Sequence, residues 1–224
     1  MLTAKLILER LDKDGRLLER REQRSRSFTK GFLELLYVAH AQILVGAPYT
    51  MTDITGVART VDGASWSGAN FRQAKGNLMI GAPPGASQVI CNNGYSSQVK
   101  MLTDTIEGNK IGIQVGTGVA AVTPTDTALA TRILHGRAAG QLEYGGCELV
   151  GIAFVNPNGE FTIRRYFTNA SGGSITVNEV GIHAVGTDQD TASWAFLIAR
   201  DITGAVAVAN TEILRVTYVP QITV

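Results

Sequence analysis

Charged residues are scarce in this sequence: Asp, Glu, Lys and Arg make up 17% of its 224 residues, below the usual quarter. Its 20 basic and 19 acidic residues nearly cancel, so no overall field attracts nucleic acid or an anionic membrane. No apolar run is long enough to cross a bilayer, and the first residues lack the basic-then-apolar pattern of a signal peptide. We therefore expect a protein that folds in a cytosol and binds neither nucleic acid nor membrane.

Cysteine and histidine are also rare. Cys91 and Cys147 are expected to be buried thiols, because a cytosolic chain seldom keeps a disulfide. Three histidines fall on separate predicted elements, without a second ligand at metal-binding spacing: His40, His135 and His183. No nucleophile elbow occurs, and the carboxylates of Asp188 and Asp190 lie in a predicted turn, where such pairs are usually just solvated. We expect a protein that is not an enzyme and binds no metal or cofactor.

Glycine, by contrast, is abundant, with 25 residues, and one glycine pair raises a specific question. Within IGIQVGTGVAAVTPTD, residues 111–126, the segment 116–121 spells G-x-G-x-x-A, the outline of a dinucleotide-binding turn. Such a turn must open directly into a helix whose N-terminus holds the pyrophosphate. A helix that starts there would carry Pro124 in its interior, where the ring clashes with the preceding turn. We therefore expect no nucleotide, and predict a short helix with Thr123 as N-cap, extending through Arg132.

The N-terminal residues predict a hairpin. Two strand-like runs, residues 4–11 and 16–21, flank a turn at residues 12–15. Acidic and basic residues are mixed along it, which is typical of a solvated face. The sharper alternative is an arm that docks on an acidic neighbour through its arginines: Arg16, Arg20, Arg21 and Arg24. Because a lone hairpin is marginal in water, we expect it to lie on its own domain, a sister copy or another protein. Deletion of residues 1–24 is expected to leave the β domain folded but weaken self-association.

The clearest helix of the sequence follows this hairpin. Ser25 or Ser27 is the predicted N-cap, and apolar residues recur at helical spacing up to about Ile43. Two interpretations stay open for the apolar stripe: core packing within the chain, or a contact between subunits. Its principal members are Phe28, Phe32, Leu35 and Leu36.

Residues 45–110 are punctuated by Gly, Pro and Asn turns and predict a loop-rich insertion with a few short strands. A loop of this length is usually functional or ordered by a partner. Trp66 and Tyr95 could contact a ligand such as a host surface glycan, or could be buried against the domain.

Beyond residue 111, strand-like runs come at regular spacing, with hairpin turns predicted at 156–159 and 169–173. This pattern predicts an antiparallel β-sandwich or jelly roll over residues 111–224. The whole chain is thus predicted to be mainly β, with an N-terminal hairpin and one amphipathic helix. We divide it into residues 1–44, 45–110 and 111–224.

The C-terminal strands carry a resemblance to a known class. RRYFTNASGGSITVNEVGIHAV, residues 164–185, with FLIARDITGAVAVANTEILRVTYVPQITV, residues 196–224, resembles the C-terminal half of virion structural proteins of tailed bacteriophages. IGIQVGTGVAAVTPTDTALATRI with the later GQLEYGG is similar to the segment that precedes it in such proteins. The resemblance covers residues 111–224 well and the first 44 residues loosely.

This resemblance implies a non-enzymatic building block of a virion, made and assembled in the host cytoplasm. It implies contacts with other copies of the chain and with other virion proteins. The tail or neck region is the expected position, and a trimer is slightly favoured, by analogy with phage appendages. Two alternatives stay open: a capsid decoration (cement) protein, and a tail-fibre module that binds a host glycan.

Overall fold

The computed structural model describes residues 2–25, 27–41, 49–61, 111–155, 157–187 and 193–223. These residues form one helix and ten strands, so the chain is mainly β, as predicted. The elements are β1 (Leu2–Leu11), β2 (Leu17–Ser25), α1 (Lys30–Ala41), β3 (Tyr49–Thr52), β4 (Ala58–Val61), β5 (Gly112–Gly116), β6 (Glu143–Val155), β7 (Asn158–Thr168), β8 (Ile175–Thr187), β9 (Ser193–Val208) and β10 (Ile213–Thr223).

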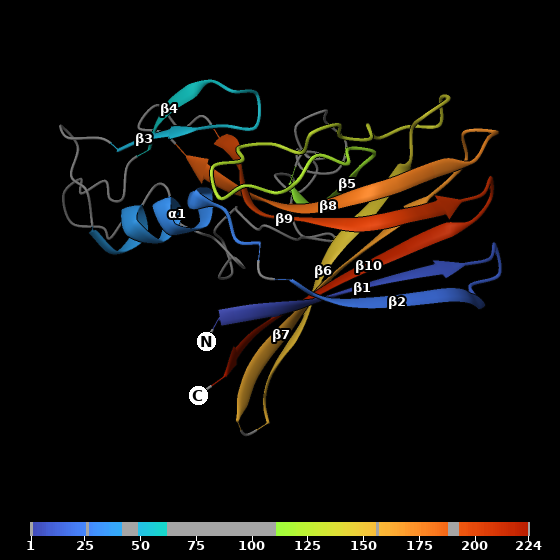
Figure 1. The fold of residues 1–224 in the computed structure, drawn as a ribbon, viewed down its shortest axis with the longest axis horizontal. Coiled ribbons are helices and arrows are strands. Elements are labelled where there is room, and N and C mark those ends of the chain that lie inside the picture. Colours follow the sequence, from blue (N-terminus) through green and yellow to red (C-terminus); the bar gives the residue numbers. More distant parts are fainter. Residues whose placement is uncertain are drawn as a thin grey trace, which may run out of the picture.

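Two antiparallel sheets form a β-sandwich. One has five strands in the order β2-β1-β10-β7-β6, and the other has three in the order β5-β8-β9. Strands β3 and β4 form a separate two-stranded hairpin. In Figure 1 the three-stranded sheet lies over one part of the five-stranded sheet, while the β6–β7 hairpin projects away from it. The five-stranded sheet is therefore covered over only part of its length.

The core lies between the two sheets and follows the alternation of the strands. On β1, Ala4, Leu6 and Leu8 are buried, while Lys5 and Ile7 between them are half-buried on the opposite face. Neighbouring strands of both sheets supply most of the rest of the core, and helix α1 adds Leu35 and Val38. The strand residues include Ile113, Val115, Ile163, Phe167, Val180, Ile182, Leu214, Val216 and Tyr218.

The predicted N-terminal hairpin is present, and it belongs to the core sheet. Strand β1 lies between β2 and β10 and pairs with β10 over its whole length, from Leu2↔Ile222 to Leu11↔Ile213. The sequence predicts a docking arm because the turn residues are charged and the hairpin offers little apolar surface. The apolar residues Ala4, Leu6 and Leu8 suffice on the face of β1 that meets the three-stranded sheet, since the other face is turned away from that sheet.

Helix α1 begins later than predicted, so the Ser25 and Ser27 caps are wrong. Ser25 ends β2, and residues 27–29 continue as an extended segment beside β9. There the Thr29 N–H donates to the Ile198 carbonyl at 3.0 Å, and the Arg200 N–H donates to the Ser27 carbonyl at 3.0 Å. Strand pairing thus holds this backbone out of the helical conformation until Lys30.

The predicted helix from Thr123 to Arg132 is also wrong. Thr123 and Asp126 close a turn, with the Thr123 hydroxyl donating to the Asp126 carboxylate at 2.6 Å. The chain then runs beside β5, where the Thr117 N–H donates to the Thr131 carbonyl and the Ile133 N–H donates to the Val115 carbonyl. Pairing with a sheet edge satisfies the same backbone groups that a helix would have satisfied.

The two predicted hairpin turns have different outcomes. The β6–β7 hairpin exists, but Asn158 and Gly159 already belong to β7, and Asn156 lies outside the described residues. Residues 169–173 do not form a hairpin, because β7 and β8 belong to different sheets. This segment crosses from one sheet to the other. The buried Asn169 organises the crossing by donating its amide to the Gly173 and Val208 carbonyls, each at 2.8 Å.

Gly172 offers a test of this crossing. Its φ is +83°, whereas its neighbour Gly173 is outside the left-handed region, and a Cβ on either residue would meet nothing within 4 Å. We expect Gly172→Val to lower the free energy of unfolding by about 1–2 kcal/mol, because a side chain is strained at this φ. Urea unfolding of Gly172→Val and Gly173→Val compares the two positions. Equal losses would show that backbone conformation is not the cause.

Candidate functional site

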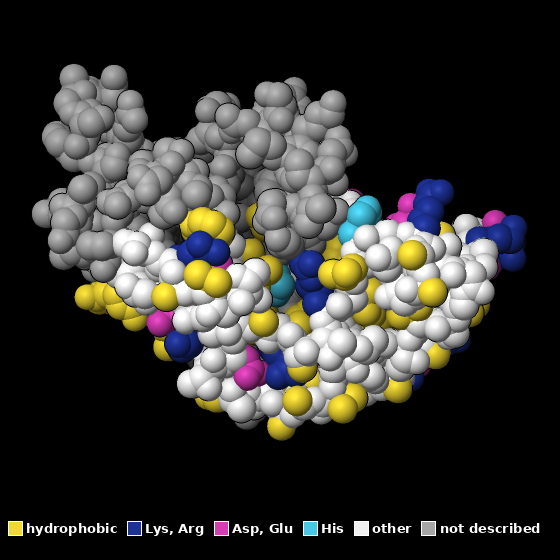
Figure 2. Space-filling view, turned by 90° about the horizontal axis from the view of Figure 1, so that it is seen from above, with side chains coloured by type: hydrophobic (Ala, Val, Ile, Leu, Met, Phe, Trp, Pro, Cys, Tyr) yellow, Lys and Arg dark blue, Asp and Glu magenta, His cyan; other side chains and the backbone are white. Residues whose placement is uncertain are grey.

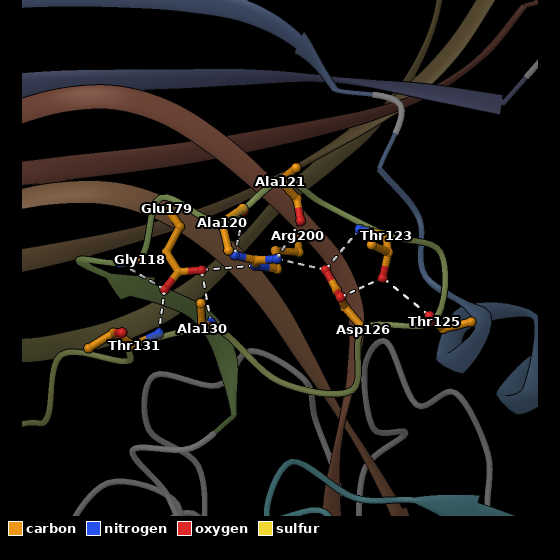
Figure 3. A network of polar contacts seen from close by, with 10 residues as sticks. All are labelled: Gly118, Ala120, Ala121, Thr123, Thr125, Asp126, Ala130, Thr131, Glu179 and Arg200. Carbon is orange, nitrogen blue, oxygen red and sulfur yellow. Dashed lines mark hydrogen bonds and ion pairs between the residues drawn. The ribbon is translucent and has the colours of Figure 1, made fainter.

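The most connected polar site is a buried network on β8 and β9 (Figure 3). Its centre is Glu179 of β8, whose side chain is fully buried. One carboxylate oxygen accepts the Gly118 and Thr131 N–H groups, at 3.1 and 2.8 Å. The other accepts the Ala130 N–H at 3.1 Å and Nε of Arg200 at 2.8 Å. Backbone donors and one guanidinium therefore neutralise this carboxylate, as a buried charge requires.

Arg200 carries the network to the turn at residues 123–126. Its Nη1 lies 2.7 Å from the Asp126 carboxylate, and its Nη2 donates to the Ala120 carbonyl at 3.0 Å. Burial alone would raise the pKa of Asp126, but hydrogen bonds from Thr123 and Arg200 hold it below its usual value. The segment 117–131 is thus tied to both β8 and β9 by charged groups.

This network explains the G-x-G pattern. A Cβ on Gly116 would lie 2.5 Å from both the Glu179 carboxylate and the Thr131 carbonyl, so the backbone approaches too closely for a side chain. A Cβ on Gly118 would lie 2.6 Å from the Ala130 side chain. The Gly118 N–H does point to an anion, together with the Ala130 and Thr131 N–H groups, in the way that the donors of a phosphate-binding turn do. The anion that they bind is the chain's own Glu179.

A second buried cluster joins the two sheets. Asp201 of β9 accepts hydrogen bonds from the Ser25 hydroxyl at 2.7 Å and from the Tyr218 hydroxyl at 2.5 Å. Burial, together with the neighbouring Asp201 carboxylate, raises the pKa of Tyr218 well above its usual value. All three side chains are buried, so this Ser–Asp–Tyr cluster is closed to a substrate and acts as a polar link inside the sandwich.

Arg165 is a third buried polar link, at the other side of the sandwich. From β7 its guanidinium donates to the Ile111 and Ile113 carbonyls beside β5, at 2.7 and 3.0 Å, and to the Gly145 carbonyl at 2.9 Å. The guanidinium carbon also lies 4.8 Å from the centre of the Tyr144 ring. Each of the three buried networks therefore connects segments far apart in the sequence.

The arginines predicted as an interface lie together on the N-terminal hairpin. Arg20, Arg21 and Arg24 are exposed on β2, and Arg16 is exposed in the turn before it. Arg20 pairs with Glu22 at 3.0 Å, whereas Arg21 pairs with Glu19 at 2.6 Å. Their contact with a partner remains a prediction.

The predicted apolar stripe packs against the core of its own chain. Leu35 is buried, and Phe28 and Phe32 pack against the core with their ring centres 4.9 Å apart, while Leu36 is half-buried. Of the two interpretations left open, these contacts match packing within the chain. Among residues 30–38 of α1, the exposed apolar side chains are those of Leu33 and Tyr37 instead.

Some of the other candidate residues from the sequence have structural contacts, and the rest lie outside the described residues. Cys147 is buried, as predicted. His135 accepts the Tyr144 N–H through Nδ1 at 2.9 Å, and His183 is buried on β8. The predicted ligand contacts Trp66 and Tyr95 lie outside the described residues, as do Cys91, Asp188 and Asp190.

The described ranges hold neither a metal-binding cluster nor a membrane-spanning helix. They hold no group of three His, Cys, Asp or Glu side chains that could bind a metal. None of their helices has both the length and the apolar character to cross a membrane. Figure 2 shows that, on the described part of one face, basic and acidic side chains occur in small separate groups among uncharged atoms.

An exposed apolar row is the surface feature that sequence reasoning missed. Phe154 of β6 and Ile222 of β10 both pair with Gly159 of β7, so they lie in one row across three strands. Phe154 is 79% exposed and Ile222 is 60% exposed. Phe154 and Gly159 adjoin the turn that joins β6 to β7, and this hairpin is the projecting end of the five-stranded sheet in Figure 1. The alternating pattern could not reveal the row, because it does not show where the covering sheet ends.

Comparisons of this chain with protein-family models, with curated proteins and with solved structures find no match.

Proposed function

We propose that this chain is a non-enzymatic structural component of a tailed-phage virion, located in the tail or neck region. In this proposal it assembles with copies of itself and with other virion proteins. The resemblance of residues 111–224 to virion structural proteins supports the phage assignment. The antiparallel sandwich that these residues form with the N-terminal hairpin is compatible with it.

The observation that carries the assembly role is the apolar row formed by Phe154 and Ile222. Gly159 between them has no side chain, and a Cβ there would lie 3.1 Å from the Phe154 ring, so the ring covers the glycine backbone. An aromatic ring that covers a strand glycine stabilises the strand pairing at that glycine. Apolar side chains grouped on a projecting end are typical of contacts with another protein.

The buried networks support a scaffold role in a different way. The carboxylates of Glu179 and Asp201 are buried, and their oxygens are taken by backbone N–H groups, an arginine and two hydroxyls. These groups hold the loops and sheets in place. An acid–base residue would instead have to reach the proton that it transfers.

Antibody labelling of phage particles that contain this chain would test the proposal. We expect label at the tail or neck in electron micrographs. Label distributed over the capsid would favour the decoration-protein alternative, and absence of the chain from purified particles would reject a virion role. Glycan binding by the isolated chain, lost in Trp66→Ala, would favour the tail-fibre module.

Point variants test the apolar row. We expect Phe154→Asp to reduce incorporation into particles several-fold, because a charge cannot be buried in an apolar contact without cost. Val119→Asp is the matched control, since Val119 is equally exposed but lies in the loop after β5. Equal incorporation of Phe154→Asp and wild-type protein would remove the row from the interface.

A further inference from the structure

The strand edges of the sandwich are not equally available for pairing. The edge of β9 is covered by residues 27–29 and by side chains of the N-terminal hairpin. Gln23, Arg21 and Arg10 donate to its carbonyls at Ile202, Ala205 and Ala207, at 3.0, 2.9 and 2.9 Å. The edge of β5 is covered by residues 131–133. Both edges of the three-stranded sheet are therefore occupied within the chain.

The five-stranded sheet ends in β6 and β2, which differ in regularity. Strand β6 has two register shifts, at 144–147 and 150–152, and such bulges disturb pairing with another strand. Strand β2 pairs with β1 without a shift from Ser25 to Glu19, and no described strand lies on its other side. It is therefore the regular open edge of the described structure. Edges of this kind pair readily with another chain unless their charges oppose it.

The charges on β2 form a self-complementary pattern. Arg21 and Gln23 reach the opposite sheet, so the alternate residues Leu18, Arg20, Glu22 and Arg24 lie on the face turned away from it. If two β2 edges pair antiparallel about a two-fold axis, each face of one copy continues into the same face of the other. An axis at Arg21 then places Arg20 opposite Glu22 of the second copy, twice.

Neighbouring registers are less favourable. An axis at Arg20 would place Arg21 opposite Glu19, but also Arg20 opposite its own counterpart and Arg24 opposite Arg16, while an axis at Glu22 would place Arg20 opposite Arg24. An axis at Gln23 would place Glu22 opposite Arg24, but it would pair only residues 21–25 of each strand, whereas Arg21 is the centre of β2 and an axis there pairs the whole strand. Like charges directly opposite one another destabilise a sheet. With the axis at Arg21, the two Arg21 side chains do face each other. Each is already held by its own chain, however, through Glu19 at 2.6 Å and the Ala205 carbonyl at 2.9 Å.

We propose that two copies of this chain associate through their β2 edges, antiparallel about a two-fold axis at Arg21, and so join their five-stranded sheets into one. The inference deepens the proposed assembly role and rests on it for the presence of many copies. A two-fold contact gives a dimer, which differs from the trimer expected by analogy. Arg20 and Glu22 are about half exposed, at 51% and 47%, so salt should weaken the contact.

Exchanging the two charges between copies tests this register. Sedimentation velocity at low salt should show a concentration-dependent dimer of the wild-type chain. Arg20→Glu alone and Glu22→Arg alone should each weaken it about tenfold or more, because two attractive pairs become repulsive. An equimolar mixture of these two variants should restore the dimer. Both pairs between positions 20 and 22 are then opposite in charge, although neither chain regains its internal Arg20–Glu22 pair.

Three outcomes would overturn the proposal: a wild-type chain that stays monomeric, single variants that associate as wild type, or a mixture that fails to recover. Arg137→Glu, on an exposed side chain elsewhere, should not change association. The double variant R20E/E22R should dimerise as wild type, which guards against a folding defect in either single variant. Dimer recovery without any virion label would reject the proposed function and keep this inference. Virion label together with a mixture of single variants that does not dimerise would reject this inference and keep the proposed function.

Discussion

Deletion of residues 1–24 is expected to abolish the cooperative unfolding of this chain. It would remove β1 and nearly all of β2 from one side of the five-stranded sheet and leave the backbone groups of β10 that pair with β1 exposed. It would also remove Ala4, Leu6 and Leu8 from the core. This expectation replaces the one from the sequence, in which the β domain stays folded without the hairpin. Circular dichroism and urea unfolding of the truncated chain measure the effect.

Point variants separate the core face of the hairpin from its exposed face. Leu6→Ala should lower the free energy of unfolding by about 2–5 kcal/mol, as buried leucine truncations do. Leu18→Ala is the matched control: Leu18 is 48% exposed on β2, so its loss should stay within about 0.5 kcal/mol. Addition of a peptide covering residues 1–25 should restore structure to the truncated chain. A truncated chain that unfolds cooperatively by itself would show that the hairpin is an appendage after all.

Replacement of Arg200 by Met should lower the free energy of unfolding by about 3–5 kcal/mol. The substitution keeps an unbranched apolar stem but removes the guanidinium that pairs with Glu179 and Asp126. Glu179 would remain buried with backbone donors alone, and its uncompensated charge is the main cost. We expect the segment 117–131 to detach first, which hydrogen exchange of the Gly118, Ala130 and Thr131 N–H groups would detect.

Arg137 provides the control for this prediction. It pairs with Glu143 at 2.6 Å, a distance close to that of the Arg200–Glu179 pair, but its side chain is 74% exposed. Arg137→Met should therefore change the free energy of unfolding by about 1 kcal/mol at most, since water already screens that pair. Similar losses in the two variants would mean that burial does not determine how much the Arg200 network contributes to the free energy of unfolding. The double variant Arg200→Met, Glu179→Gln should recover part of the loss, because the amide oxygen can still accept backbone N–H groups while the buried negative charge is gone.

The alternation of apolar and polar residues was sufficient to predict most strands. In β7 and β10 every second side chain faces the core, and such a pattern identifies a half-buried strand without knowledge of its partners. The same reasoning placed the N-terminal hairpin turn, where the Asp12 carboxylate accepts the Asp14 and Arg16 N–H groups. Local chemistry alone determines these features.

Long-range pairing explains the errors. Residues 27–29 and 131–133 were assigned to or near helices, yet both are extended, because each is bonded to the edge of a distant strand. The turn at 169–173 contains Asn and Gly, as hairpins do, but it crosses between sheets. Capping residues and turn residues indicate only which backbone conformations a segment can adopt. Which backbone partner it receives depends on strands far away in the sequence.

The sequence by itself determined the class of fold, the positions of most strands, and the conclusion that the G-x-G segment cannot open a phosphate-binding helix. Only the tertiary structure decided that β1 is an inner strand, that Glu179 occupies the glycine loop, and that Phe154 and Ile222 form one exposed row. The physical reason is the range of the interactions. Alternation and turn chemistry act over a few residues, whereas strand order, buried ion pairs and the extent of a covering sheet join residues that are distant along the chain.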